Sequence, residues 1–295
     1  MDPVQEAVSK ITVPLIQRRK LEGEKITCLT AYDFLTAKLV DAAGVDVILV
    51  GDSLGTVVLG YDSTLPVTLD EILHHLRAVR RGTRKALLVG DLPFGSYHVS
   101  EEQGVEAALR CVKEGGAEAV KLEGGQKRAP LIRRLVESEI PVMAHLGLTP
   151  QSIHIFGGHR VQGKTLDDAS EILADAEAVE EAGAFAVVLE GVPRDLAASV
   201  TRRLRIPTIG IGAGPECDGQ ILVVQDLLGL TPEPRPKFVR AYANLAATAR
   251  QAIENYRADV LCGRFPSDAE SYHWPAEVRQ QFDKADAPLP LRVKF

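Results

Sequence analysis

The amino-acid sequence predicts a single-domain α/β protein built as a (β/α)8 barrel, a closed ring of eight parallel strands surrounded by helices. Short apolar runs alternate with helical segments from residue 25 onward, and about eight such units fit within roughly 240 residues. No linker rich in Pro, Gly or Ser divides the chain into separate domains. A doubly wound open sheet is the alternative architecture.

Each predicted strand is a short and mostly apolar run, which is typical of parallel strands covered on both faces. In chain order the eight runs are 25–33, 45–52, 85–92, 117–125, 140–148, 184–192, 206–214 and 220–229. The helices expected between them are 34–44, 68–82, 100–116, 127–139, 165–183 and 194–204. Gly44, Gly116 and Gly183 end three of these helices, where glycine readily adopts the left-handed conformation.

The two ends of the chain lie outside this alternation. Residues 1–24 are predicted to form a leading helix and turn, residues 25–263 the barrel, and residues 264–295 a C-terminal tail. A closing helix is expected from about Phe238, because the apolar residues 238, 242, 245, 249, 253 and 256 share one helical face.

Composition argues against several classes of function. Hydrophobic residues make up 45% of the chain, and the net charge of −6 is unlike that of a nucleic-acid-binding surface. The first ten residues carry no export or organelle signal, and no apolar run approaches the length of a membrane helix. The four cysteines form no Cys-x-x-Cys pair, so we expect reduced thiols, a cytoplasmic location and no zinc site.

Polar side chains stand where the predicted strands end. In a parallel barrel these ends meet at one face, which is the face that carries active sites. The residues concerned are Tyr32, Asp33, Asp52, Ser53, Asp91, Lys121, Glu123, His145 and Glu190. Lys121 and Glu123 are two residues apart on one strand and therefore share a face. One such acid is usually a helix cap, but six consecutive strands with polar ends indicate a site.

Several carboxylates at one barrel mouth repel one another unless a cation lies among them. Mg²⁺ fits this setting, because it prefers oxygen ligands and usually takes one or two protein carboxylates besides water and substrate. The alternative is that Asp52, Asp91 and Glu123 form salt bridges with Lys121 and neighbouring arginines.

Two further features suggest different chemistry. Residues 158–165, GHRVQGKT, match the phosphate-loop pattern of nucleotide hydrolases, but they follow a loop rather than a buried strand. We interpret the segment 149–163 as a lid or substrate-binding loop instead. A buried strand lysine such as Lys121 can form a Schiff base, but the neighbouring Glu123 would keep it charged and unreactive.

Seven longer peptides complete the pattern: LVGDSLG, YDSTLPVTLDEI, GDLPFGSY, VKLEGG, HLGLTPQS, FGGHRVQG and IGIGAGPECDGQILVVQDLLG. Together they resemble the ketopantoate (3-methyl-2-oxobutanoate) hydroxymethyltransferase family over roughly residues 10 to 265. The resemblance implies a barrel of the phosphoenolpyruvate mutase and isocitrate lyase type, bound Mg²⁺, and a homo-oligomer, commonly a decamer. The tail after about residue 270 runs beyond the usual end of the family.

The resemblance also implies roles for individual residues. Asp52 and Asp91 match metal and substrate ligands, and Glu123 matches a third metal ligand. Ser53 and Lys121 match the residues of the family that hold the substrate carboxylate and keto oxygen. The general base is matched by Glu190.

The implied reaction transfers a hydroxymethyl group from 5,10-methylenetetrahydrofolate to 3-methyl-2-oxobutanoate by Mg²⁺-assisted enolisation. From the residues alone, we infer metal-assisted proton abstraction beside a carbonyl. A related barrel lyase or mutase acting on another 2-oxo acid is therefore the main alternative, with the nucleotide hydrolase behind it.

Overall fold

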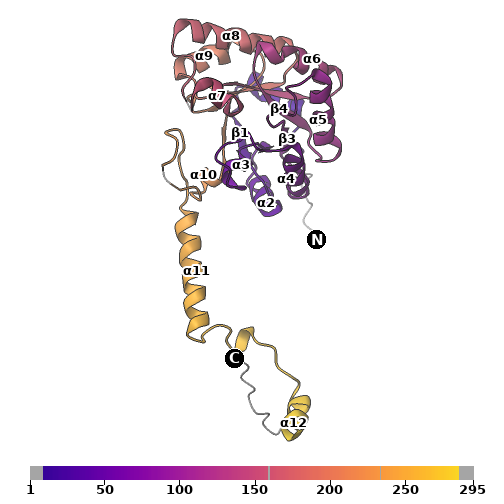
Figure 1. Cartoon of the computed structure of the whole chain (residues 1–295), viewed down its shortest axis with the longest axis vertical. Helices are drawn as coiled ribbons and strands as arrows, with labels where there is room; N and C mark the ends of the chain where they lie inside the picture. Colours follow the sequence, from indigo (N-terminus) through magenta and orange to yellow (C-terminus); the bar gives the residue numbers. More distant parts are fainter. Residues whose placement is uncertain (1–8, 159, 233, 286–295) are drawn as a thin grey trace. The chain divides into compact units, whose positions relative to one another are not determined.

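The computed structural model describes residues 9–158, 160–232 and 234–285. Its eight strands run parallel and close into one barrel in chain order, so the predicted (β/α)8 class is confirmed (Figure 1). The strands are β1 Ile26–Thr30, β2 Val47–Val50, β3 Leu87–Asp91, β4 Ala119–Glu123, β5 Val142–Gly147, β6 Ala186–Glu190, β7 Thr208–Ile211 and β8 Gly219–Leu222. Each strand overlaps the run predicted for it.

Helices surround this barrel and connect most of its strands. They are α1 Val13–Glu22, α2 Phe34–Ala42, α3 Leu54–Val57, α4 Leu69–Gly82, α5 Glu101–Lys113, α6 Ala129–Glu137, α7 Ile153–Phe156, α8 Leu166–Glu181, α9 Arg194–Arg203 and α10 Val224–Leu227. Short 3₁₀ turns lie at η1 Gln126–Arg128 and η2 Pro150–Ser152. Gly44, Gly116 and Gly183 have φ angles of +79°, +73° and +97°, as predicted for the residues that end three helices.

Side chains that alternate along the strands divide the core into two parts. Val47 and Leu49 of β2, like Leu87 and Val89 of β3, belong to a cluster inside the barrel, which also contains the fully buried Ile16 of α1. The intervening side chains belong to the larger cluster formed with the surrounding helices. Because the period is two, the inward positions continue to the carboxyl end of each strand, where the apolar layers give way to polar residues.

Helix α1 is tied to the amino-terminal end of the barrel by ion pairs. Arg19 lies 2.8 Å from Asp46, just before β2, and Lys20 lies 2.7 Å from Asp218, just before β8. The opposite, carboxyl-terminal end is therefore left open for a site.

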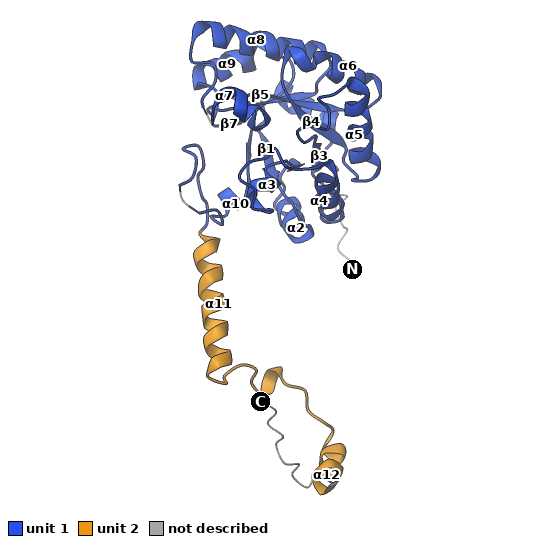
Figure 2. Cartoon of the chain, in the orientation of Figure 1, with its two compact units in different colours: residues 1–243 blue, residues 244–295 orange. Residues whose placement is uncertain are grey.

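The chain divides into two compact units, residues 1–243 and 244–295 (Figure 2). The barrel lies in the first unit, and the second contains α11 Leu245–Leu261, η3 Asp268–Glu270 and α12 Ala276–Ala285. This division falls before residue 263, where the sequence placed the end of the barrel. In the described segments no helix is both long enough and apolar enough to cross a membrane.

The prediction that the last long helix begins near Phe238 is wrong. The helix begins at Leu245, after Asn244, whose side chain accepts the Ala247 N–H. Phe238 lies instead in a turn that contacts Gly212, where an added Cβ would come within 2.8 Å of the aromatic ring. The apolar spacing therefore joined Phe238 and Tyr242, which belong to the first unit, to four residues that belong to the second unit.

Candidate active site

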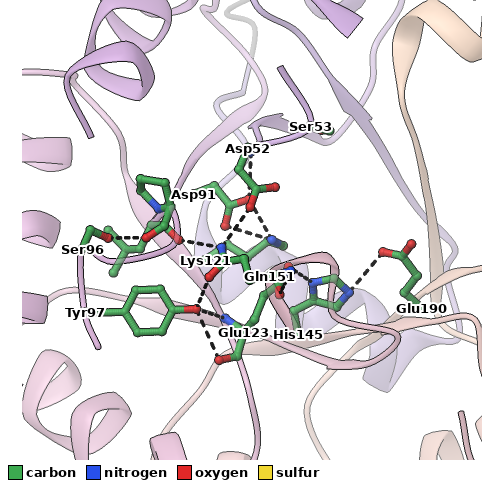
Figure 3. Close-up of polar contacts among 12 residues, drawn as sticks. Asp52, Ser53, Asp91, Ser96, Tyr97, Lys121, Glu123, His145, Gln151 and Glu190 are labelled. Carbon is green, nitrogen blue, oxygen red and sulfur yellow. Dashed lines mark hydrogen bonds and ion pairs between the residues drawn. The ribbon is translucent and has the colours of Figure 1, made fainter. Parts of the chain in front are cut away.

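The carboxyl ends of the strands surround a cavity of about 140 Å³ that opens to solvent. All the site residues predicted from the sequence line it: Asp52, Ser53, Asp91, Lys121, Glu123 and Glu190, together with His145. Figure 3 shows the acidic side chains, Lys121 and His145 gathered into one connected group. Two other polar residues at the end of β1 do not line the cavity: Tyr32 is buried, and the carboxylate of Asp33 accepts the Thr36 N–H and caps α2.

Lys121 is held by Asp91 across adjacent strands. The register of β3 and β4 makes the two residues neighbours, and Lys121 Nζ donates to both carboxylate oxygens of Asp91 at 2.8 Å. The prediction that Glu123 is the immediate partner is wrong, because residues two apart on a strand are separated by about 6.6 Å, whereas neighbouring strands lie about 4.8 Å apart.

The charges of this pair follow from its surroundings. Burial by itself would lower the pKa of Lys121, but the carboxylates of Asp91, Glu123 and Asp52 raise it above its ordinary value. Burial raises the pKa of Asp91, and the charge of Lys121 offsets part of that effect. Lys121 is therefore a fixed cation suited to binding an anion, and a neutral Schiff-base nucleophile is disfavoured.

His145 lies between two carboxylates. Its Nδ1 is 3.3 Å from Glu123 Oε1 and its Nε2 is 3.2 Å from Glu190 Oε2, without the alignment of good hydrogen bonds. Burial and Lys121 favour the neutral ring, but the two carboxylates prevail and raise the pKa of His145 to about 9. His145 therefore links Glu190, the predicted base, to Asp52, Asp91 and Glu123, which we call the acidic cluster.

Asp52 stands in the turn that follows β2 and is also buried. Its backbone N–H donates to Asp91 Oδ2 at 3.1 Å, and its own Oδ2 accepts from Gln151 Nε2 at 2.9 Å. Burial, and then the charge of Asp91, raise the pKa of Asp52 well above its ordinary value. A cation beside Asp52 and Asp91 would reverse this shift.

The donor set suits a hard cation that keeps most of its water. Glu123 Oε1 is buried without a well-aligned hydrogen bond. Burial alone would raise the pKa of the Glu123 carboxyl, but His145, Lys121 and the Gln151 N–H outweigh it and lower that pKa. Within the described residues, no group of three or more His, Cys, Asp or Glu side chains is arranged to hold a metal ion. Mg²⁺ does not require such a group, because one or two carboxylates commonly suffice.

The other residues around the cavity suit a small organic acid. Ser53 Oγ lies 2.8 Å from the Tyr32 hydroxyl, so the serine is held at the mouth next to Asp52. Apolar side chains line the same cavity, and they are Leu49, Val188, Ile211, Ile221, Leu222, Val223 and Phe238. A cavity with a buried lysine, several carboxylates and a branched apolar lining fits an anion that carries an apolar group.

Two residues of this network were missed by the sequence analysis. The Tyr97 hydroxyl donates to Gln151 Oε1 at 2.7 Å and accepts the Glu123 N–H at 3.2 Å. The sequence places Gln151 only within the predicted lid or substrate-binding loop 149–163. Neither residue is charged and neither ends a strand, so the only available signals were the peptides GDLPFGSY, which contains Tyr97, and HLGLTPQS, which contains Gln151.

The structural context of the phosphate-loop match is unsuitable for nucleotide binding. The segment is preceded by the short helix α7 rather than by a strand, and Thr165 serves as the N-cap of α8 by accepting the Asp168 N–H. Residue 159 of the motif lies outside the described residues.

Known proteins resemble this chain over most of its length. A family model described as Ketopantoate hydroxymethyltransferase matches residues 10–268. The 3-methyl-2-oxobutanoate hydroxymethyltransferase of Koribacter versatilis is 55% identical over 92% of this chain and 92% of its own length. The protein of the same name from Moorella thermoacetica is 56% identical over 90% of this chain and 98% of its own length.

Solved structures extend the likeness of the fold to more distant proteins. A phosphonopyruvate hydrolase in complex with oxalate and Mg²⁺ aligns with a TM-score of 0.56 at 16% identity, over 92% of this chain and 95% of that one. A 2,3-dimethylmalate lyase of the PEP mutase/isocitrate lyase superfamily aligns with a TM-score of 0.52 at 16% identity, over 92% and 95%. The predicted barrel type is thereby confirmed, and on the family match and the sequence identities the chain belongs to the ketopantoate hydroxymethyltransferase family of enzymes.

Proposed function

We propose that this protein transfers a hydroxymethyl group from 5,10-methylenetetrahydrofolate to 3-methyl-2-oxobutanoate, giving 2-dehydropantoate for pantothenate biosynthesis. Membership of the family and the names of its relatives support the activity. One observation of the site supports it most strongly. The carboxylate of Glu190 lines the same cavity as the buried cation Lys121 and the acids Asp52 and Asp91.

Mg²⁺ would be held by Asp52 and Asp91, with Glu123 bound directly or through water. When bound, the ion would polarise the keto oxygen and stabilise the charge that develops there during enolisation. Support comes from the buried carboxylates and from Glu123 Oε1, which lies 3.3 Å from His145 Nδ1 but has no well-aligned hydrogen bond.

Side chains of this protein carry out the remaining steps. Ser53 and Lys121 hold the carboxylate and keto oxygen of the substrate, and Glu190 removes the proton from C3. The resulting carbon nucleophile forms a bond to the methylene carbon of the folate. The bonds from that carbon to the two folate nitrogens break, and one water supplies the hydroxyl group of the product. The released nitrogens take up the proton removed from C3 and the second proton of that water, which gives tetrahydrofolate.

Proton exchange tests this proposal without folate. The protein is incubated with 3-methyl-2-oxobutanoate in heavy water, with Mg²⁺ or with a chelator, and loss of the C3 proton is followed by NMR. We expect exchange that requires Mg²⁺, and 2-dehydropantoate once 5,10-methylenetetrahydrofolate is added. Exchange without that product would favour a related lyase or mutase, and absence of exchange would contradict the proposed chemistry.

We also propose a cytoplasmic homo-oligomer, with a decamer as the expected form. The exposed apolar residues Leu35 and Leu39 of α2 support association, as do Ile253, Tyr256 and Leu261 of α11. Light scattering during size-exclusion chromatography measures the mass, and a monomer at micromolar concentration would contradict the proposal.

A further inference from the structure

Gln151 enters the acidic cluster from the loop 149–163 rather than from a strand. It lies in η2 and is only 6% exposed. Its Nε2 donates to Asp52 Oδ2 at 2.9 Å and to the Leu92 carbonyl at 3.1 Å, while its Oε1 accepts from the Tyr97 hydroxyl at 2.7 Å (Figure 3). Both hydrogens and the oxygen of the side-chain amide are thus in use.

The backbone of the same residue reaches a second carboxylate. The Gln151 N–H donates to Glu123 Oε2 at 3.0 Å. One residue of the loop therefore binds one oxygen on each of two acids, Asp52 and Glu123, which stand at the ends of β2 and β4. Hydrogen bonds to charged groups are stronger than those between neutral groups, so these contacts fix both the carboxylates and the start of the loop.

We propose that Gln151 is a positioning residue that couples the order of the loop 149–163 to cation binding by Asp52 and Glu123. The identity of the cation rests on the proposed function. Gln151 takes Asp52 Oδ2 and Glu123 Oε2, and the other oxygen, Glu123 Oε1, lies 3.3 Å from His145 Nδ1 without a well-aligned hydrogen bond. A cation that demands near-ideal ligand geometry gains from carboxylates that are already oriented.

Coupling of this kind acts in both directions. Because the cation and the loop share Gln151, a bound cation should make the loop less accessible, and loss of the amide should weaken cation binding. A merely structural role for Gln151 would alter stability without linking these two properties.

The test uses Gln151→Met, which keeps the size of the side chain but removes its amide. Gln162→Met is the matched control, because Gln162 lies in the same loop and its Nε2 donates to the Arg160 carbonyl, outside the acidic cluster. Gln151→Asn, which keeps the amide but shortens its reach, serves as a second variant with the same expected direction. Circular dichroism establishes that each protein is folded.

Two measurements on the full chain are made, neither of which requires activity. Mn²⁺, which also accepts oxygen ligands, is titrated and its free form followed by electron paramagnetic resonance. Trypsin cleavage after the exposed residues Arg160 and Lys164 is followed by mass spectrometry, with and without Mn²⁺.

We expect Gln151→Met to bind Mn²⁺ about 10–100-fold more weakly than the unmodified protein. Cleavage after Arg160 and Lys164 should be faster in this variant without metal, and Mn²⁺ should no longer slow it. Gln162→Met should match the unmodified protein in Mn²⁺ affinity and in protection by Mn²⁺. Unchanged Mn²⁺ affinity in Gln151→Met, or unchanged protection of the loop, would overturn the proposal.

The proposed metal site fails separately if the unmodified protein binds no Mn²⁺. The role of Gln151 in holding the loop is then decided by cleavage without metal. Equal rates for Gln151→Met and Gln162→Met would overturn that role as well.

Discussion

Lys121 and Asp91 form a buried ion pair in which Nζ donates to both carboxylate oxygens at 2.8 Å. The pair lies across β3 and β4, one layer above the apolar interior of the barrel. Removing one partner of a buried pair leaves an uncompensated charge, which commonly costs about 3–5 kcal/mol. Asp91 therefore affects the stability of the site as well as its proposed chemistry.

Asp91→Asn keeps the shape of the side chain but removes the charge that faces Lys121 and the proposed cation. We expect weaker Mg²⁺ binding, lower activity and a free energy of unfolding reduced by up to about 3–5 kcal/mol. Calorimetric titration with Mg²⁺ and denaturant unfolding measure these effects. Asp33→Asn is the control, because Asn also caps a helix. Full activity of Asp91→Asn at low Mg²⁺ would contradict the assignment.

Glu190→Gln keeps the size of the side chain but cannot accept the C3 proton. A positioned base typically contributes about 10²–10⁴-fold, so exchange at C3 in heavy water should slow by that factor. Binding of Mg²⁺ and of the keto acid should change far less, because Glu190 is not assigned as a ligand to either. If the variant exchanges the proton at the normal rate, the base lies elsewhere and Glu123 is the next residue to test.

Lys164→Ala removes the lysine on which the phosphate-loop match depends. Because α7 rather than a strand precedes the motif, we expect neither the unmodified protein nor the variant to bind ATP tightly. Equilibrium binding of a fluorescent ATP analogue with Mg²⁺ checks this. Tight binding that is lost in Lys164→Ala would restore the nucleotide hydrolase as a candidate function.

Ile16→Ala removes a fully buried side chain of α1 that belongs to the interior cluster of the barrel. We expect the free energy of unfolding to fall by about 2–5 kcal/mol, because a cavity is left in place of the side chain. Leu21→Ala in the same helix is the control, since Leu21 is 81% exposed. Equal thermal stability of the two variants would show that α1 contributes little to the core.

Glu71→Gln tests a pH-dependent contribution to stability. The Thr68 N–H and the Tyr61 hydroxyl donate to the Glu71 carboxylate and lower its pKa in the folded protein. A carboxyl of this kind contributes stability above its unfolded pKa of about 4.3, and the contribution is lost as the pH falls through the lower folded value.

The unmodified protein should therefore be more stable than Glu71→Gln at pH 7, and the difference should shrink as the pH falls below about 4.3 and disappear below the lowered folded pKa. Denaturant unfolding at several pH values measures the difference. A difference that does not shrink as the pH falls below about 4.3 would show that the charge of Glu71 contributes nothing.

Much of the barrel can be predicted from local sequence patterns. Apolar runs of strand length alternate with helical segments, and the inward positions of each strand follow from a period of two. The strand ends therefore identified Asp52, Asp91, Lys121, Glu123 and Glu190 as residues of one mouth before any contact was known. The start of α11 could not be predicted in this way, because the spacing of apolar residues does not reveal which neighbour covers each side chain.

The partners of these residues were decided only by the tertiary structure. Strand register, which depends on how the whole barrel closes, places Lys121 beside Asp91 and Glu123 beside His145. The loop that follows β5 brings Gln151 between Asp52 and Tyr97, although 99 residues separate Gln151 from Asp52 in the chain. A local sequence pattern determines which face a side chain occupies, but the residue it meets across that face depends on chain segments that are far apart in the sequence.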